Sequence, residues 1–297
     1  MGIGEFYALV CAACWATAVI LFKHAGNSLS AKGLNLTKNI IGLILLVPTA
    51  VVMEGIELPV LTASQWVIVA VSGYFGVAVA DTWYLQALRN LGAGRTAIVA
   101  SLYSPFVILL SVIFLGEKMQ GWQWFGFALV ILGVFIVTYQ KNYQDIERTL
   151  LLKGVLYGAA SVFVTAASVV AMKPILVNDG FFWMISLRML AGVVGMLIYL
   201  GVRQQLTEII NDVRYKPHKW LTIFMASVFG TYLAIVFWLA GFKYADASIA
   251  SVLNETSSVM IVFLAWLLLK EPLTNTKIIG MLLTFFGVLV FMGLLHI

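Results

Sequence analysis

Long apolar runs separated by short polar stretches make up nearly all of the sequence. Ten of these runs reach about 20 residues, the length that a helix needs to cross a bilayer. They cover residues 4–23, 34–53, 64–88, 96–116, 121–140, 153–173, 181–201, 219–242, 247–269 and 274–295. Most connections are short, so consecutive helices are expected to be antiparallel neighbours. The pattern predicts an all-α integral membrane protein with ten transmembrane helices.

Two connections are longer and more polar, at residues 141–152 and 202–219. In the second connection, four apolar residues recur at a spacing that places them on one face of a helix. They are Leu206, Ile209, Ile210 and Val213. Basic residues accompany this face, so the segment predicts a short helix lying on the membrane surface.

The two halves of the chain contain related positions at a nearly constant offset of about 150 residues. The matching positions include Gly4 and Gly154, Tyr7 and Tyr157, Lys38 and Arg188, and Glu117 and Glu271. This predicts a first five-helix repeat at 1–141, a connecting loop at 142–152 and a second five-helix repeat at 153–297. Because five is odd, the second repeat is inverted relative to the first. Inverted repeats suit alternating access around a central site.

The composition agrees with lipid as the solvent of this chain. Hydrophobic residues make up 62% of it and charged residues only 10%, against about 25% charged residues in a soluble domain. A net charge of +5 would suggest nucleic acid as the partner of a soluble protein. Here the basic residues lie mostly in connections that orient membrane helices, so no nucleic-acid partner is expected.

The distribution of Lys and Arg predicts an orientation in the membrane. Thirteen of them follow the odd-numbered helices, and three lie on the opposite side. Because cytoplasmic loops carry an excess of Lys and Arg, the first group is expected to face the cytoplasm. Both termini then lie outside.

Four charged residues lie inside predicted helices, where each costs at least about 2.5–3.5 kcal/mol to insert. They are Lys38, Asp81, Arg188 and Glu255. One interpretation is that they form structural salt bridges between packed helices, and the other is that they mark a site. Because burial disfavours a charged carboxyl group, Asp81 or Glu255 is a candidate for proton coupling or for binding an amine. Lys38 and Arg188 are candidates for holding a substrate carboxylate.

Several short motifs recur in a recognisable order along the chain. They are Trp15 in an Ala-rich first helix, the cations Lys38 and Arg188, Ala87-Leu88, Pro105, Gly116-Glu117 and Lys270-Glu271-Pro272. Together they resemble the EamA-type transporters of the drug/metabolite transporter superfamily. The resemblance covers essentially the whole chain and implies ten helices, no use of ATP and transport of small metabolites. Asp81 and the Asn254-Glu255 step depart from the family pattern, so the resemblance does not assign the substrate.

Aromatic residues complete the candidate site. Trp15, Tyr103 and Trp238 lie in helices that the resemblance places around a central cavity, where they are candidates for holding an amine by cation–π attraction. Packing in the bilayer is the alternative role for each. Asn254 is a further candidate because it lies next to Glu255, and Pro105 predicts a kink in the fourth helix.

We expect a secondary active transporter of a small polar or amphipathic metabolite, with an amino acid or amine favoured and proton coupling as a further hypothesis. A nucleotide-type or sugar-type metabolite is the alternative substrate. A lipid-acting membrane enzyme or a channel is the alternative from another class. No cofactor or metal is expected, since the sequence has no P-loop and its three His are scattered. The expected location is a bacterial or archaeal plasma membrane, with a monomer as the working form.

Overall fold

Helices build the fold of the computed structural model, which describes residues 2–25, 29–115, 120–138, 148–176, 180–215, 217–245, 247–291 and 293. The first half contains α1 (Ile3–Ala25), α2 (Ala31–Glu54), α3 (Ala63–Gly73), η1 (Tyr74–Ala80), α4 (Asp81–Leu91), α5 (Ala93–Ala100), α6 (Tyr103–Leu115) and α7 (Gly121–Thr138). The second half contains α8 (Arg148–Leu176), α9 (Phe181–Val202), α10 (Leu206–Tyr215), α11 (Trp220–Ser227), η2 (Val228–Leu233), α12 (Ala234–Tyr244), α13 (Ala247–Leu269) and α14 (Asn275–Phe291).

Eight helical stretches within the described ranges are long and apolar enough to cross a membrane. Three of them are composite: α3, η1 and α4 form one stretch, α5 and α6 form the second, and α11, η2 and α12 form the third. The described part of α7 contains a shorter apolar run, Trp124–Gly133, and α14 covers 17 residues. The prediction of an all-α membrane protein is confirmed, whereas the count of ten spans stays a prediction.

The side chains are distributed as expected for a protein dissolved in lipid. Large apolar side chains such as Val52, Ile113 and Leu156 lie exposed on the outer surface. Charged side chains such as Lys38 and Arg188 are buried between the helices, each with 3% of its surface exposed. Lipid offers no hydrogen bonds, so the polar groups within the spans must find their partners inside the bundle.

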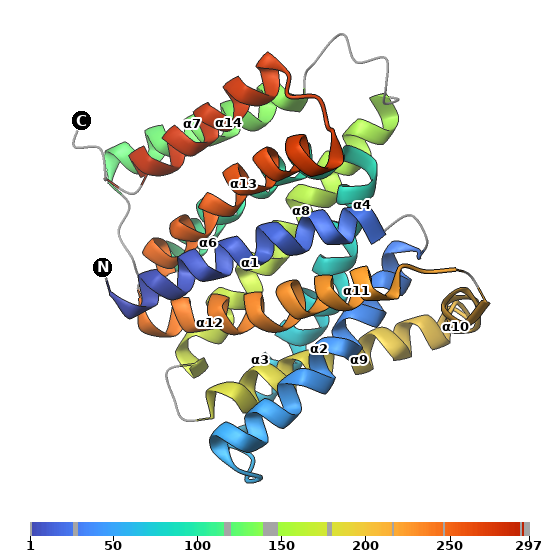
Figure 1. Cartoon of the computed structure of the whole chain (residues 1–297). Helices are drawn as coiled ribbons and strands as arrows, with labels where there is room; N and C mark the ends of the chain where they lie inside the picture. The colour runs from blue at the N-terminus through green and yellow to red at the C-terminus, as the bar shows by residue number, and fades with distance from the viewer. Residues whose placement is uncertain are drawn as a thin grey trace.

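The two halves pack against each other in a reciprocal way. Helix α1 packs against α12 and α13, and its counterpart α8 packs against α4 and α6. Helices α2 and α9 lie together at one edge of the molecule, and α7 and α14 lie together at the opposite edge (Figure 1). This exchange of equivalent partners agrees with duplication, and the inversion of the repeats stays a prediction. Residues 142–147 of the predicted connection are outside the described ranges, while 148–152 already belong to α8.

Two carboxylates tie the halves together by capping helices of the opposite half. Glu54, at the end of α2, accepts hydrogen bonds from two backbone N–H groups at the start of α9, both at 3.0 Å. Glu271 accepts from the first two N–H groups of α5, at 2.7 and 3.1 Å. The N-terminus of a helix carries unsatisfied donors and a partial positive charge, which explains both contacts.

A π-helical turn interrupts the third helix of each half. The turns η1 and η2 begin at Tyr74 and Val228, which are equivalent positions of the predicted repeat. Asp81 follows directly after η1. A π-turn leaves backbone carbonyl groups without their usual helical donor, and such turns are frequent at functional sites.

The predicted fourth helix is broken between α5 and α6, at Ser101 and Leu102. The physical cause is Pro105, which has no N–H to donate to the carbonyl group of Ser101, four residues earlier. The break therefore creates a new helix N-terminus at the start of α6, inside the bundle. The long polar connection contains the helix α10, which buries Ile209 and exposes Ile210. Its place on the membrane surface stays a prediction.

Candidate functional site

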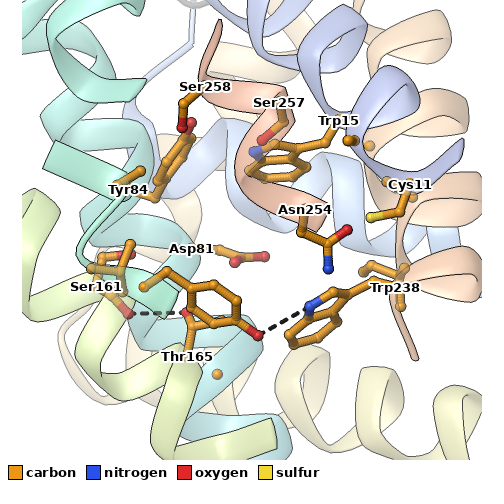
Figure 2. A pocket seen from close by; sticks show the side chains of 18 of the residues that line it. Cys11, Trp15, Asp81, Tyr84, Ser161, Thr165, Trp238, Asn254, Ser257 and Ser258 are labelled. Carbon is orange, nitrogen blue, oxygen red and sulfur yellow. Dashed lines mark hydrogen bonds between the residues drawn. The ribbon is translucent and has the colours of Figure 1, made fainter. Parts of the chain in front are cut away.

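A cavity of about 160 Å³ lies in the middle of the bundle and is lined by side chains from both halves (Figure 2). Helices α1, α2, α6, α8, α9, α12 and α13 contribute to its wall, as do the segments around the two π-turns. All eight candidates from the sequence line this one cavity. They are Trp15, Lys38, Asp81, Tyr103, Arg188, Trp238, Asn254 and Glu255.

Lys38 and Asp81 form a direct ion pair in the cavity wall. The Nζ of Lys38 lies 2.6 Å from Oδ2 of Asp81, and the exposed fractions of the two side chains are 4% and 24%. Lys38 also donates to Oδ1 of Asn39 at 2.8 Å. For this pair, the structural salt bridge expected as one alternative is present between α2 and the start of α4.

Asn35 holds the π-turn that positions Asp81. Its Nδ2 lies 3.0 Å from the carbonyl oxygens of Val77 and Ala78, which belong to η1. Its Oδ1 accepts a hydrogen bond from Asn39 at 2.9 Å, so the network continues to Lys38. Two buried asparagines of α2 thus satisfy carbonyl groups that the π-turn exposes, and they link the turn to the ion pair.

Arg188 occupies the position equivalent to Lys38 but has no equivalent of Asp81. The repeat places Ile235 where the first half has Asp81. One guanidinium nitrogen, Nη2, donates to Ser168 at 3.0 Å, and the group lies over the ring of Trp238. Asp81 attracts it from a distance. Among the described residues, no carboxylate forms an ion pair with Arg188, and its Nε lacks a hydrogen-bond partner.

Glu255 is the second charge in the wall without a counter-ion among the residues that the structure describes. Its carboxylate accepts hydrogen bonds from the hydroxyl groups of Ser104 and Ser258, at 3.1 and 3.2 Å. The break at Pro105 places Ser104 in the first turn of α6, so the Glu255 carboxylate lies at a helix N-terminus. The partial positive charge of that terminus favours an anion.

The aromatic candidates form two contacts around the polar groups. The ring of Trp15 packs against Tyr84 at 5.3 Å between centroids. Trp238 donates from Nε1 to the hydroxyl of Tyr103 at 3.1 Å. Asn254 lies between the indole rings of Trp15 and Trp238 in Figure 2. Large planar faces and a few polar groups therefore enclose a small space, as in many small-molecule sites.

The chain matches the EamA-like transporter family twice, over residues 2–139 and again over residues 152–293. The chain belongs to this family. An uncharacterized transporter from Archaeoglobus fulgidus is 25% identical over 219 residues, covering 73% of this chain and 74% of that protein. An uncharacterized transporter in the sor 3'region of Acidianus ambivalens is 38% identical over 69 residues, which span 23% of this chain and 27% of the relative.

A solved crystal structure shares the fold of this EamA-like protein, with a TM-score of 0.64 and 15% identity. The match covers 97% of this chain and 95% of the other. The family and its named relatives identify the protein as a multi-pass membrane transporter. Its partners are therefore the bilayer and a small-molecule substrate.

Other residues line the cavity or hydrogen-bond to its wall, and the sequence analysis did not single them out as site candidates. They are Asn35, Asn39, Tyr84, Ser104, Ser168 and Ser258. Asn35 and Asn39 are detectable in hindsight, because they lie four residues apart on the helical face of Lys38 and polar groups in a span need partners. The serines carry no such signal, since a single Ser satisfies itself on its own helix backbone.

Proposed function

We propose that the protein is a secondary active transporter of a small zwitterionic solute of the amino-acid type. In this proposal the two halves are inverted repeats, and they open alternately to the two sides of the membrane. One observation carries the proposal: Arg188 and Glu255 lie in the wall of one small cavity, and neither forms an ion pair with a described residue. We call these two groups the open charges. The family membership and the transporter relatives support the class of protein.

The charges in the wall divide into one closed pair and two open groups. Lys38 and Asp81 neutralise each other at 2.6 Å. Arg188 and Glu255 carry opposite charges, and neither has an ion-pair partner among the described residues. A buried charge without a partner is expensive, and a ligand that brings the missing counter-charge relieves this cost. A zwitterion supplies both, its carboxylate for Arg188 and its ammonium group for Glu255.

The size of the cavity favours this solute over the alternatives. A volume of about 160 Å³ is below the roughly 300–1,000 Å³ of typical drug-sized sites. This disfavours a nucleotide-type metabolite, which is larger than an amino acid. A simple amine would match Glu255 and leave Arg188 without a partner, so it is a weaker fit than a zwitterion.

Proton coupling is the second part of the proposal, and Glu255 suits it better than Asp81. Asp81 already has a counter-ion, because Nζ of Lys38 lies 2.6 Å from its carboxylate. Among the described residues, the donors to the Glu255 carboxylate are neutral serine hydroxyl groups. In the proposal it therefore has two routes to neutrality: the ammonium group of the solute, or a proton. Competition between the two couples the movement of the solute to that of a proton.

Counterflow in proteoliposomes tests the transport function. We expect saturable exchange of a labelled amino acid, and a raised apparent melting temperature when that amino acid binds. Removing one partner of a buried charge contact costs about 2–5 kcal/mol, so Arg188→Gln is expected to weaken binding by at least about 30-fold. Glu255→Gln is expected to abolish the pH dependence of transport while the protein still folds.

The alternatives predict different results in the same vesicles. A channel would give flux without saturable counterflow, and a lipid-acting enzyme would release product from the bilayer. Unchanged transport and an unchanged pH profile in Glu255→Gln would remove Glu255 from the mechanism. The archaeal relatives favour a prokaryotic plasma membrane.

A further inference from the structure

The side-chain amide of Asn254 lies in the cavity wall, and neither of its two hydrogen-bonding atoms has a partner in the part of the chain that the structure describes. Asn254 lies on α13, directly before Glu255. Both its Nδ2 and its Oδ1 are buried, and neither forms a hydrogen bond with any residue that the structure describes. In Figure 2 the amide projects into the space between Trp15, Trp238 and Asp81.

Neighbouring polar groups in the same wall are largely satisfied. Lys38 contacts Asp81 and Asn39, the carboxylate of Glu255 accepts from serines, and Trp238 donates to Tyr103. Within the described part of the wall, the other unpaired buried atoms are the Nε of Arg188 and the hydroxyl oxygen of Tyr84. Asn254 differs from both because it offers a separate donor and acceptor on one planar group.

An unpaired amide in a low-dielectric cavity selects for a ligand that completes its hydrogen bonds. A carboxamide does so most fully, because its carbonyl oxygen accepts from Nδ2 while its N–H donates to Oδ1. A carboxylate lacks the donor, an ammonium group lacks the acceptor, and an alkyl group lacks both. A site built around a buried hydrogen-bonding group rejects an analogue that leaves this group unpaired.

The flanking rings of Trp15 and Trp238 suit the same ligand group. A carboxamide is flat and short, so it fits between planar faces in a cavity of about 160 Å³. The position of Asn254 next to Glu255 on α13 also places it beside the proposed ammonium site. The side chain of an amino acid bound at Glu255 and Arg188 must therefore occupy the remaining part of the same small cavity.

We propose that Asn254 is a specificity-determining residue, and that the preferred solute is a zwitterionic amino acid with a carboxamide side chain. This inference rests on the proposed function, in which Arg188 and Glu255 hold the two backbone charges of the solute. In this proposal Asn254 hydrogen-bonds to the side chain of the solute, while Arg188 and Glu255 bind its carboxylate and ammonium groups.

The test compares glutamine, leucine and lysine in proteoliposomes that contain the full-length protein. The unmodified protein is expected to prefer glutamine over leucine by at least about tenfold, which corresponds to 1.4 kcal/mol. Asn254→Leu is expected to abolish this preference while leucine exchange persists. Thr256→Val is the matched control, since Thr256 is on the same helix and donates to its own backbone, to the carbonyl oxygen of Leu253.

A second variant keeps the test informative if Asn254→Leu fails to fold. Asn254→Asp preserves the shape and removes the donor, so it is expected to weaken glutamine exchange and to improve that of an amino acid with a side-chain ammonium group. Equal exchange of glutamine and leucine by the unmodified protein would overturn the inference about Asn254 and leave the zwitterion site standing. Failure of every amino acid to exchange or to raise the melting temperature would overturn both.

Discussion

The ion pair between Lys38 and Asp81 is predicted to be an energetically coupled unit of the fold. The Nζ and Oδ2 atoms lie 2.6 Å apart, and Lys38 is almost fully shielded, with 4% of its side chain exposed. Replacing Asp81 by Asn keeps the shape and removes the charge. Lys38 then stays buried without a counter-ion, which costs about 3–5 kcal/mol for a buried pair. We expect a loss near 3 kcal/mol, because the 24% exposure of Asp81 places the pair partly in the cavity.

The double variant distinguishes a coupled pair from two independent residues. Lys38→Met alone leaves Asp81 unpaired but partly exposed, so its cost is expected to be smaller than that of Asp81→Asn. In Lys38→Met with Asp81→Asn, no charge is stranded. The double variant should therefore be more stable than the sum of the single losses implies, by about 1–3 kcal/mol.

Unfolding of purified protein in mixed detergent micelles measures these free energies of unfolding. Glu57→Gln serves as a control, because Glu57 is an exposed carboxylate. Additive losses in the three variants, with no coupling between Lys38 and Asp81, would refute the assignment of a closed ion pair. They would also weaken the distinction between closed and open charges on which the zwitterion site depends.

Two further predictions concern contacts between the halves. Glu271→Ala removes the acceptor of two backbone N–H groups at the start of α5, and we expect a loss of about 0.5–2 kcal/mol in the free energy of unfolding, as for other helix caps. No loss relative to Glu57→Ala would contradict this role. Gly76→Ala places a methyl group against the guanidinium of Arg188, so we expect weaker solute binding in a thermal-shift titration. The control Gly201→Ala meets no atom within 4 Å and should bind as the unmodified protein does.

The candidate site was predictable from the cost of burying charge in lipid. Lys38, Asp81, Arg188 and Glu255 are conspicuous in apolar segments, and the cavity contains all four. Their pairing was not predictable, because it depends on which helices meet. Lys38 and Arg188 occupy equivalent positions of the predicted repeat. Only the packing shows that Lys38 pairs with Asp81, whereas Arg188 forms no ion pair with a carboxylate among the described residues.

The π-turns and the break before α6 were outside what periodicity reveals, for a common reason. A π-turn adds one residue to a helical turn. In a span that is apolar on all faces, this extra residue does not change the pattern of apolar positions, so the sequence does not reveal the turn. Asn35 satisfies the carbonyl groups of η1 from a helix more than 40 residues away in the chain. Pro105 did predict a disturbance of its helix, and the structure adds that Ser104, in the first turn of α6, contacts Glu255 through its hydroxyl group.

By itself, the amino-acid sequence determined the solvent and the helical class, and it marked the charged candidates that line the cavity. The reason is that transferring backbone and charge into lipid carries a large free-energy cost, which composition and spacing record. The tertiary structure decided which charges form ion pairs and that Asn254 has no hydrogen-bond partner among the residues described. These outcomes depend on distances of a few ångströms between helices far apart in the chain, and only their packing sets those distances.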